Sequence, residues 1–253
     1  MLQVDLNCDM GESSALFPYD RNKDLELLEL ISSVNIACGY HAGDPETMNV
    51  ILTRALELDV AVGAHPGYDD KANFGRKYIP LSEEEVYNMV FRQCELLAGM
   101  LASKGSHLHH VKPHGALYNA AAKDAELATT ICRAVADIAP GLQFYGLSGS
   151  AMEASAIACG LQFIREVFAD RSYQDDGTLT PRDLPGALLQ DSGKSLKQAL
   201  EMVMHESVET LSGKKIWIQA DSICVHGDGP HALEFARSIR EGLAQNLVMI
   251  KAR

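Results

Sequence analysis

Hydrophobic and polar positions alternate at the start of the chain. In extended backbone, successive side chains point to opposite faces. The odd positions therefore share one polar face, and the even positions share an apolar one: Asp5, Asn7 and Asp9 against Val4, Leu6 and Cys8. An acidic face opposite an apolar one is what a barrel strand shows when its polar side points into a site. Gly11 then permits a turn.

Similar strand-like segments recur between segments with helical spacing. Strands are predicted over residues 2–7, 33–37, 60–63, 107–112, 142–147, 163–168, 216–219 and 222–225. Helices are predicted over about 23–31, 45–58, 83–103, 124–138, 150–159, 196–211 and 232–243. The helix starts are marked by Asp44 before Pro45 and by a capping box of Ser82 with Glu85.

Alternating strands and helices imply right-handed βαβ crossovers and a mainly parallel sheet. We count seven strand–helix units, and at least five strand ends carry polar clusters. An open doubly wound sheet would concentrate its site at one switch point, whereas barrel enzymes build theirs around a whole rim. The pattern favours an α/β fold with a TIM-like (β/α) barrel, seven-stranded and distorted, as a single domain over residues 1–253.

Composition excludes some classes of function. A net charge of −12 disfavours non-specific nucleic-acid binding, which needs Lys and Arg to displace counterions. The six cysteines are scattered without a CxxC pair, as in a reduced cytosolic protein. We find no secretory signal and no apolar run long enough to span a membrane. We therefore expect a cytoplasmic location.

The richest stretch is His110–Asn119, HVKPHGALYN, which begins as a strand and ends as a helix. His110, Lys112 and His114 alternate, so they share one face in extended backbone. Two imidazoles and an ammonium are costly to bury unless they meet acids, a metal or an anionic substrate. Other strand ends carry similar side chains: His41, His65, His226, Asp5, Asp9, Asp44, Glu166, Asp170 and Asp228. We expect a shared site.

Two mechanisms could use this site. Imidazoles and a carboxylate could bind a divalent metal that activates water, with Asp9, His41 and His65 as candidate ligands. Alternatively, carboxylate and imidazole could act as general acid and base while Lys112 neutralises an oxyanion. No HExxH motif is present to decide between them. Cys38 and Cys224 are better explained as packing residues than as nucleophiles.

Nucleotide-binding patterns are not recognisable. Gly193-Lys194-Ser195 resembles the end of a phosphate loop, but Leu188 stands where that loop needs glycine. We interpret the segment as a helix N-terminus. No GxGxxG opens a helix either.

Long segments of the chain resemble the LamB/YcsF lactam-utilisation family. The matching segments are 5–12 (DLNCDMGE), 35–45 (NIACGYHAGDP), 63–70 (GAHPGYDD), 74–76 (FGR), 110–119 (HVKPHGALYN), 166–173 (EVFADRSY) and 220–228 (ADSICVHGD). The segment after Glu12 and Tyr40 depart from the family pattern, and both departures affect loop shape more than charged groups.

The resemblance implies a barrel related to glycoside hydrolases and polysaccharide deacetylases. It also implies ATP-dependent 5-oxoprolinase activity, in which 5-oxo-L-proline, ATP and water give L-glutamate, ADP and phosphate. The chain would act with partner subunits B and C, which would use the ATP. We expect catalytic roles for Asp9, His65, Lys112, His114, Glu166 and Asp170. Substrate contacts are expected from Asn7, Asn35, His41, Tyr118, Asn119, Arg171, Arg182, His226 and Asp228.

Two other functions remain open. The Asp and His content also suits a stand-alone metal-dependent deacetylase or amidohydrolase acting on a small amide or carbohydrate. A non-catalytic subunit that only presents substrate to its partners is the second alternative.

Overall fold

Seven parallel strands form a closed barrel in the computed structural model, which describes residues 2–13, 20–227 and 231–253. Each strand pairs with the next around the ring, and β1 closes it by pairing with both β2 and β9. The predicted seven-stranded TIM-like barrel is thereby confirmed. Its strands are β1 (Gln3–Met10), β2 (Ser33–Ala37), β3 (Ala61–His65), β4 (His110–Val111), β5 (Gln143–Leu147), β6 (Gln162–Phe168) and β9 (Ser222–His226).

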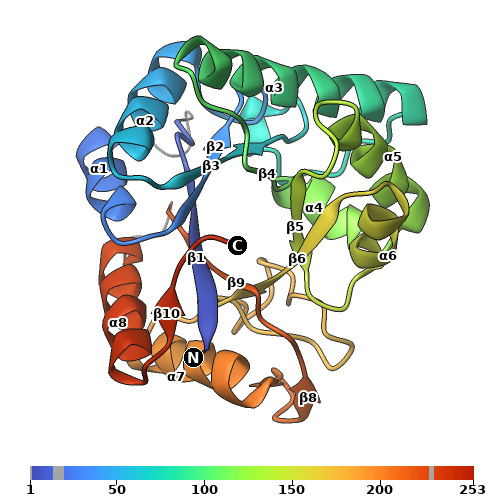
Figure 1. Cartoon of the computed structure of the whole chain (residues 1–253). Coiled ribbons are helices and arrows are strands. Elements are labelled where there is room, and N and C mark those ends of the chain that lie inside the picture. The colour runs from blue at the N-terminus through green and yellow to red at the C-terminus, as the bar shows by residue number, and fades with distance from the viewer. Residues whose placement is uncertain (1, 14–19, 228–230) are drawn as a thin grey trace.

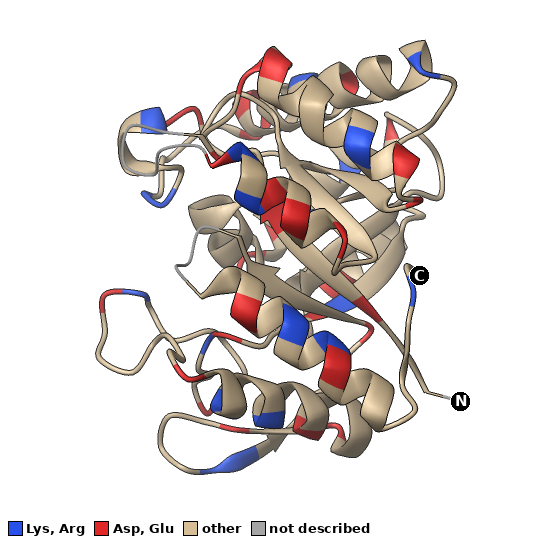
Figure 2. Cartoon of the chain, turned by 90° about the vertical axis from the view of Figure 1, so that its left-hand side faces the viewer, with Lys and Arg blue, Asp and Glu red and all other residues tan. Residues whose placement is uncertain are grey.

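Helices surround the strands, as the view in Figure 1 shows. They are α1 (Arg21–Leu28), α2 (Pro45–Glu57), α3 (Glu83–Ser103), α4 (Gly115–Ala121), α5 (Ala125–Ala136), α6 (Ala151–Ala158), α7 (Ser192–His205) and α8 (Ala232–Gln245). A short 3-10 turn, η1, covers Lys71–Asn73. Charged side chains are scattered over these helices and the loops, while the strands are mostly uncharged (Figure 2).

Local sequence signals explain where several helices begin. The Asp44 side chain accepts a hydrogen bond from Thr47 N, with Pro45 in the first turn. Ser82 and Glu85 form the predicted capping box, and α3 occupies the predicted residues. These polar caps satisfy amide groups that the first helical turn leaves unpaired.

The helix predicted over 196–211 is present, but it begins and ends earlier than predicted. Asp191 caps α7 by accepting from Lys194 N, so the helix begins at Ser192 and includes the GKS segment in its first turn. It ends at His205 because Glu206 adopts a left-handed conformation, with φ of 48°. The chain continues as an antiparallel pair, β7 (Ser207–Glu209) and β8 (Lys215–Trp217). A further short strand, β10 (Met249–Ile250), pairs with the start of β1.

The barrel has an apolar outside and a polar inside. Val4, Leu6 and Cys8 of β1 are fully buried in the hydrophobic core. Asp5 points inward, where Ser33 and Ser222 donate hydrogen bonds to it. The predicted alternation of β1 is therefore confirmed. The hydrophobic effect stabilises the packing of the helices against the outer face of the barrel, and hydrogen bonds satisfy the polar side chains inside it.

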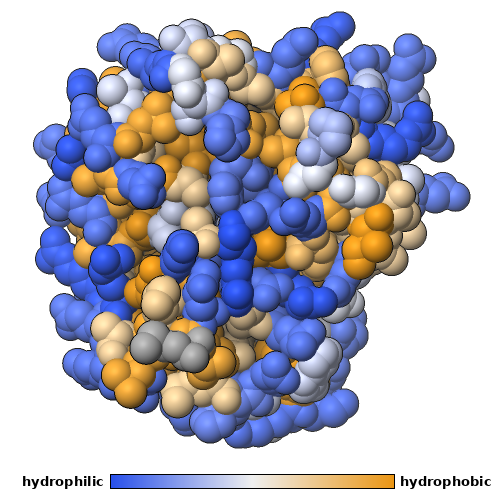
Figure 3. Space-filling view, in the orientation of Figure 1, coloured by the Kyte–Doolittle hydropathy of each residue, from blue (hydrophilic) through white to orange (hydrophobic). Residues whose placement is uncertain are grey.

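The last residue of the chain lies beside the start of β1. Arg253 donates to Gln3 O, which ties the last residue to the first strand. In the orientation of Figure 1, the surface shows hydrophilic and hydrophobic residues interspersed (Figure 3). Among the described residues, no helix is long and apolar enough to cross a membrane.

Candidate functional site

A cavity of about 630 Å³ lies at the carboxyl ends of the barrel strands. Strand ends and the segments that follow them supply its walls, as expected for a (β/α) barrel. Its polar lining includes Asp9, Glu12, His65, Arg76, Lys112, His114, Tyr118, Asn119, Arg171, Arg182, Asp183 and His226. The strand-end side chains of the sequence therefore do converge.

The Lys112 centre, defined as Lys112 with Asp9 and Glu166, lies on the cavity wall. Lys112 follows β4 directly and is 2% exposed. Its Nζ is 2.9 Å from Asp9 Oδ1 and 2.7 Å from Glu166 Oε1. The Cys224 sulfur is 3.1 Å away. One ammonium thus lies between two buried carboxylates, which satisfy the charge that burial would otherwise penalise.

Electrostatics keep the Lys112–Asp9 pair ionised. Burial lowers the pKa of Lys112, but the negative charges of Asp9 and Glu166 outweigh it and raise that pKa well above its ordinary value. Burial raises the pKa of Asp9, but His65 and Lys112 outweigh it and hold that pKa well below its ordinary value. Lys112 is therefore a permanent cation at neutral pH.

A buried network of amides supports the Lys112 centre from below. Asn35 Nδ2 donates to Asn7 Oδ1 and to Asp9 Oδ1, both at 2.8 Å. Asn7 Nδ2 in turn donates to Glu166 Oε1 at 3.0 Å. His110 Nε2 lies 2.7 Å from Asn35 Oδ1, which fixes the amide. These contacts hold both carboxylates in place against the ammonium.

The imidazole cluster, defined as Glu12, His41, His65 and His114, forms the neighbouring part of the site. One oxygen, Glu12 Oε1, is 3.0 Å from His114 Nδ1, 3.3 Å from His41 Nε2 and 3.8 Å from His65 Nε2. His41 and His114 stack with ring centroids 3.8 Å apart. Gly67 makes room for His41, since a Cβ there would lie 2.7 Å from His41 Nδ1.

Burial decides the pKa shifts of two of the three rings in this cluster. It lowers the pKa of His41 to about 3 and also lowers the pKa of His114. Burial raises the pKa of Glu12, but His114 and His41 outweigh it and hold that pKa well below its ordinary value. Burial lowers the pKa of His65, but the nearby Asp9 carboxylate raises it by more, so the net pKa lies above the ordinary value for histidine. Because His65 Nε2 is 3.4 Å from Asp9 Oδ2, it joins the two parts of the site.

An imidazole–carboxylate pair completes the cavity wall. His226 Nδ1 is 2.8 Å from Asp170 Oδ2. A carboxylate on one ring nitrogen fixes the orientation of the imidazole and supports a positive charge on it. His226 lines the cavity, so this pair can take or give a proton there.

The predicted site residues divide into two groups by position. Asp9, His65, Lys112, His114, Tyr118, Arg171, Arg182 and His226 line the cavity, with Asn119 exposed at its rim. Four others lie behind this lining: Asn7, Asn35, Glu166 and His41 are each fully buried. Glu166 nevertheless reaches Lys112 and accepts from the Tyr118 hydroxyl at 2.7 Å.

Other expectations need correction. Asp5 lies near the amino end of β1, where the Ser32 and Ser33 hydroxyls donate hydrogen bonds to it. The alternation of side chains shows which face of a strand a residue lies on, but not how far along the barrel axis it lies. Asp44 is a helix cap, whose carboxylate accepts from Thr47 N at the start of α2. Asp228 and most of the departure after Glu12 (residues 14–19) lie outside the described residues.

The structure groups the candidate metal ligands differently from the expectation. His41 and His65 converge with Glu12 and His114, whereas Asp9 converges with Cys224 and His226. Glu12 was missed as a site residue because it lies beyond the strand's alternation. Gly11, with φ of 72°, turns the chain so that Glu12 faces the histidines. Its place at the end of DLNCDMGE was the available signal.

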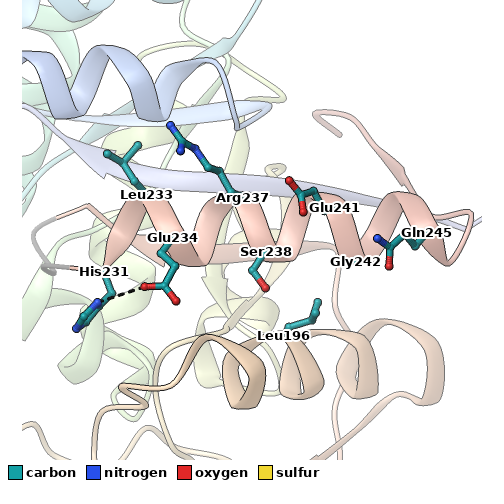
Figure 4. Close-up of a pocket in the computed structure, with 9 residues that line it drawn as sticks. All are labelled: Leu196, His231, Leu233, Glu234, Arg237, Ser238, Glu241, Gly242 and Gln245. Carbon is teal, nitrogen blue, oxygen red and sulfur yellow. Dashed lines mark ion pairs between the residues drawn. The ribbon is translucent and has the colours of Figure 1, made fainter.

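Another hollow lies between α7 and α8, shown in Figure 4. Its lining includes an exposed ion pair, with His231 Nδ1 3.5 Å from Glu234 Oε2. Arg237 and Glu241 project from α8 in the same view. These groups are solvated helix side chains, so the barrel cavity is the better candidate site.

Comparisons with known proteins cover the whole barrel. The chain is 50% identical over 252 residues to the 5-oxoprolinase A subunit of Tolumonas auensis, covering 100% of both chains. It is 46% identical over 243 residues to the 5-oxoprolinase A subunit of Bacillus subtilis, covering 96% of this chain and 94% of that one.

Solved structures give the same result for the fold. The lactam utilization protein of Thermus thermophilus has a TM-score of 0.92 at 42% identity, with 100% of both chains covered. A T48 deacetylase has a TM-score of 0.50 at 14% identity and shares the fold alone, over 98% of this chain and 87% of that one.

A comparison with models of whole protein families agrees with these matches. Residues 4–253 match the LamB/YcsF family. The resemblance inferred from the sequence is confirmed, and the chain belongs to the LamB/YcsF family.

Proposed function

We propose that this chain is the A subunit of an ATP-dependent 5-oxoprolinase, which opens the ring of 5-oxo-L-proline to give L-glutamate. The observation that carries the proposal is Lys112, a buried cation held between Asp9 and Glu166 on the wall of the cavity. The full-length similarity to proteins named as this component of 5-oxoprolinase supports it.

The reaction needs an activated carbonyl. A lactam is a resonance-stabilised amide, so water attacks it poorly; phosphorylation of its oxygen makes an imidate that water can attack. His226, oriented by Asp170, takes a proton from the water as its oxygen bonds to the ring carbon. The carbon–nitrogen bond then breaks as the new hydroxyl becomes a carbonyl, and both protons of the water, one of them carried by His226, pass to the nitrogen. The acyl phosphate that results reacts with a second water, which releases phosphate and leaves L-glutamate. Lys112 stabilises negative charge on the oxygen of the tetrahedral intermediate.

Arginines provide contacts for the anionic parts of the substrate. Arg76, Arg171 and Arg182 line the cavity, and guanidinium groups match carboxylates and phosphates well. Tyr118 and Asn119 lie on the same wall. Asn7, Asn35 and His41 lie behind the lining, so we assign them to positioning rather than to substrate contact.

ATP use is assigned to partner subunits B and C. The sequence has no recognisable phosphate-binding loop, and the relatives' names, which designate one lettered component of 5-oxoprolinase, support a multi-subunit enzyme. All six cysteines are free thiols, which suits the cytoplasm as the place of action.

Reconstitution tests this division of labour. The purified chain is expected neither to hydrolyse ATP nor to open 5-oxoproline at a useful rate. Adding subunits B and C is expected to produce ATP-coupled glutamate, measured by chromatography together with phosphate release. ATP-dependent turnover by this chain alone would contradict the assignment, as would full turnover by B and C without it.

The imidazole cluster favours a second candidate function, a stand-alone metal-dependent amidohydrolase or deacetylase. ATP-independent hydrolysis of a small amide or acetylated sugar by the chain alone, abolished by chelator, would favour this candidate. Tight 5-oxoproline binding, with turnover in the complex unaffected by loss of Lys112, would instead indicate a subunit that only presents substrate.

A further inference from the structure

The imidazole cluster brings four potential metal ligands to one point. The ligand atoms of Glu12, His41, His65 and His114 all lie within 4.8 Å of one another. His114 Nδ1 is 3.0 Å from both Glu12 Oε1 and His65 Nε2. The residues come from separate loops and strand ends that meet only in the folded barrel.

Backbone carbonyls fix the orientation of two of the rings. His65 Nδ1 is 2.7 Å from Lys112 O, and His114 Nε2 is 2.9 Å from Phe74 O. A carbonyl oxygen only accepts hydrogen bonds, so each of these outer nitrogens carries the proton. In the neutral rings the inward nitrogens, His65 Nε2 and His114 Nδ1, then present lone pairs. Outer-side hydrogen bonds of this kind orient metal-binding histidines.

The inward side therefore has an excess of electron pairs. Two ring nitrogens face each other at 3.0 Å, and the Glu12 carboxylate faces them both. His41 Nε2 adds a further nitrogen, 3.3 Å from the same oxygen. A single proton can bridge only one pair of these atoms, whereas a metal cation can accept electron pairs from all four.

We propose that Glu12, His41, His65 and His114 form a binding site for a divalent transition metal of the zinc class. Imidazole nitrogens with one carboxylate oxygen suit Zn²⁺ and similar ions. Glu12, His65 and His114 also line the cavity, so the ion would be accessible from it. The site adjoins the Lys112 centre, because His65 Nε2 is 3.4 Å from Asp9 Oδ2, but its existence does not depend on the proposed 5-oxoprolinase activity.

Direct metal measurement tests the site without any assay of turnover. The full chain is purified without chelator, then stripped, dialysed and titrated with ZnCl₂ in a calorimeter. We expect about one zinc ion per chain, with X-ray absorption showing mainly nitrogen ligands at about 2.0–2.1 Å. Zinc is also expected to raise the melting temperature, because it binds the folded state.

Variants identify the ligands. His41→Gln and Glu12→Gln are each expected to weaken zinc binding by about tenfold or more, because changing residues around a bound metal typically reduces its affinity by about 10- to 100-fold. His231→Gln is the matched control, since His231 is exposed beside α8 (Figure 4) and should leave binding unchanged. Circular dichroism checks that each variant folds. His114→Asp supplies a second test, because its carboxylate can still bind metal and should retain more affinity than His114→Ala.

Three results would overturn the proposal. The first is a stripped wild-type chain that takes up less than about a tenth of an equivalent of zinc, or of MnCl₂ in a parallel titration. The second is stoichiometric binding that folded His41→Gln and Glu12→Gln variants leave unchanged. The third is zinc uptake without nitrogen ligands in the absorption spectrum, which would place the ion elsewhere.

Discussion

The two parts of the site meet at His65 and Asp9 but have opposite charge balances. The Lys112 centre has one ammonium between two carboxylates, all nine-tenths or more buried. The imidazole cluster has one carboxylate among three buried imidazoles. The first places one cation between two anions, whereas the second gathers several ring nitrogens around one carboxylate oxygen.

This difference separates two ways of making a buried site chemically useful. In the Lys112 centre, mutual ion pairing keeps both signs of charge available near the substrate. In the imidazole cluster, burial keeps two rings neutral, with pKa values below the ordinary one for His41 and His114. Neutral imidazoles are the form that accepts a metal or a proton.

The largest effect is expected from removing the Lys112 ammonium, the charge that distinguishes the Lys112 centre from the imidazole cluster. Lys112→Met keeps the length of the side chain but removes the charge that we propose stabilises the oxyanion. Loss of one such donor typically reduces the rate by about a hundred- to a thousand-fold. We expect that loss in partner-dependent glutamate formation, assayed at saturating 5-oxoproline.

Stability must be separated from catalysis in this variant. Lys112→Met leaves Asp9 and Glu166 buried without their cation, which costs about 3–5 kcal/mol in comparable pairs. The double variant Lys112→Met with Glu166→Gln removes one uncompensated charge and should recover part of that loss, measured by urea unfolding. Activity that recovers along with stability would show that Lys112 only holds the strand ends together.

Another buried carboxylate, Asp24, extends the comparison to the dependence of stability on pH. Asp24 is 7% exposed and accepts a hydrogen bond from Gly11 N. Burial raises its pKa from 3.8 to about 6. Below about pH 4 its contribution to stability is fully present, and it is lost as pH rises through 6, because the folded protein holds a proton that the unfolded chain releases. Asp9, with a lowered pKa, has the opposite sign.

The Asp24→Asn variant should therefore flatten the stability profile between about pH 4 and 6. The change is on the order of 3 kcal/mol, since the pKa differs by about two units between folded and unfolded states and each unit corresponds to about 1.4 kcal/mol. Urea unfolding at a series of pH values measures it. Glu95→Gln, which alters an exposed carboxylate on α3, serves as control. An unchanged profile in Asp24→Asn would contradict the raised pKa.

The smallest effect is expected at Cys224. Its sulfur touches Lys112 Nζ, but burial raises the pKa of its thiol well above the ordinary value, so it stays protonated and is a poor nucleophile. Cys224→Ala should keep activity within about threefold and lower stability by about 1 kcal/mol, the size of a small cavity. Loss of activity as large as that of Lys112→Met would instead assign the thiol to catalysis.

The sequence was most informative where one local rule decided the outcome. Capping by Asp44 and Ser82 located two helices, and alternation in β1 identified which face is polar. Loops were harder to predict, because the position of Glu12 depends on a turn at Gly11 and on histidines from three other segments. The position of a residue along the barrel axis was also not predictable: Asp5 and Asp9 have the same place in the alternation, yet only Asp9 lines the cavity.

The polar interior of the barrel has a consequence for how the chain reaches its native state. Asp5 and Asn7 complete their hydrogen bonds with Ser222, 217 and 215 residues away. These contacts form only when β1 meets β9, and long-range contacts of this kind slow folding because the intervening chain must first be ordered. Until then, the carboxylate of Asp5 stays hydrated. Closure of the ring should therefore be a late and cooperative event, and the wall that carries Lys112 should become rigid only with it.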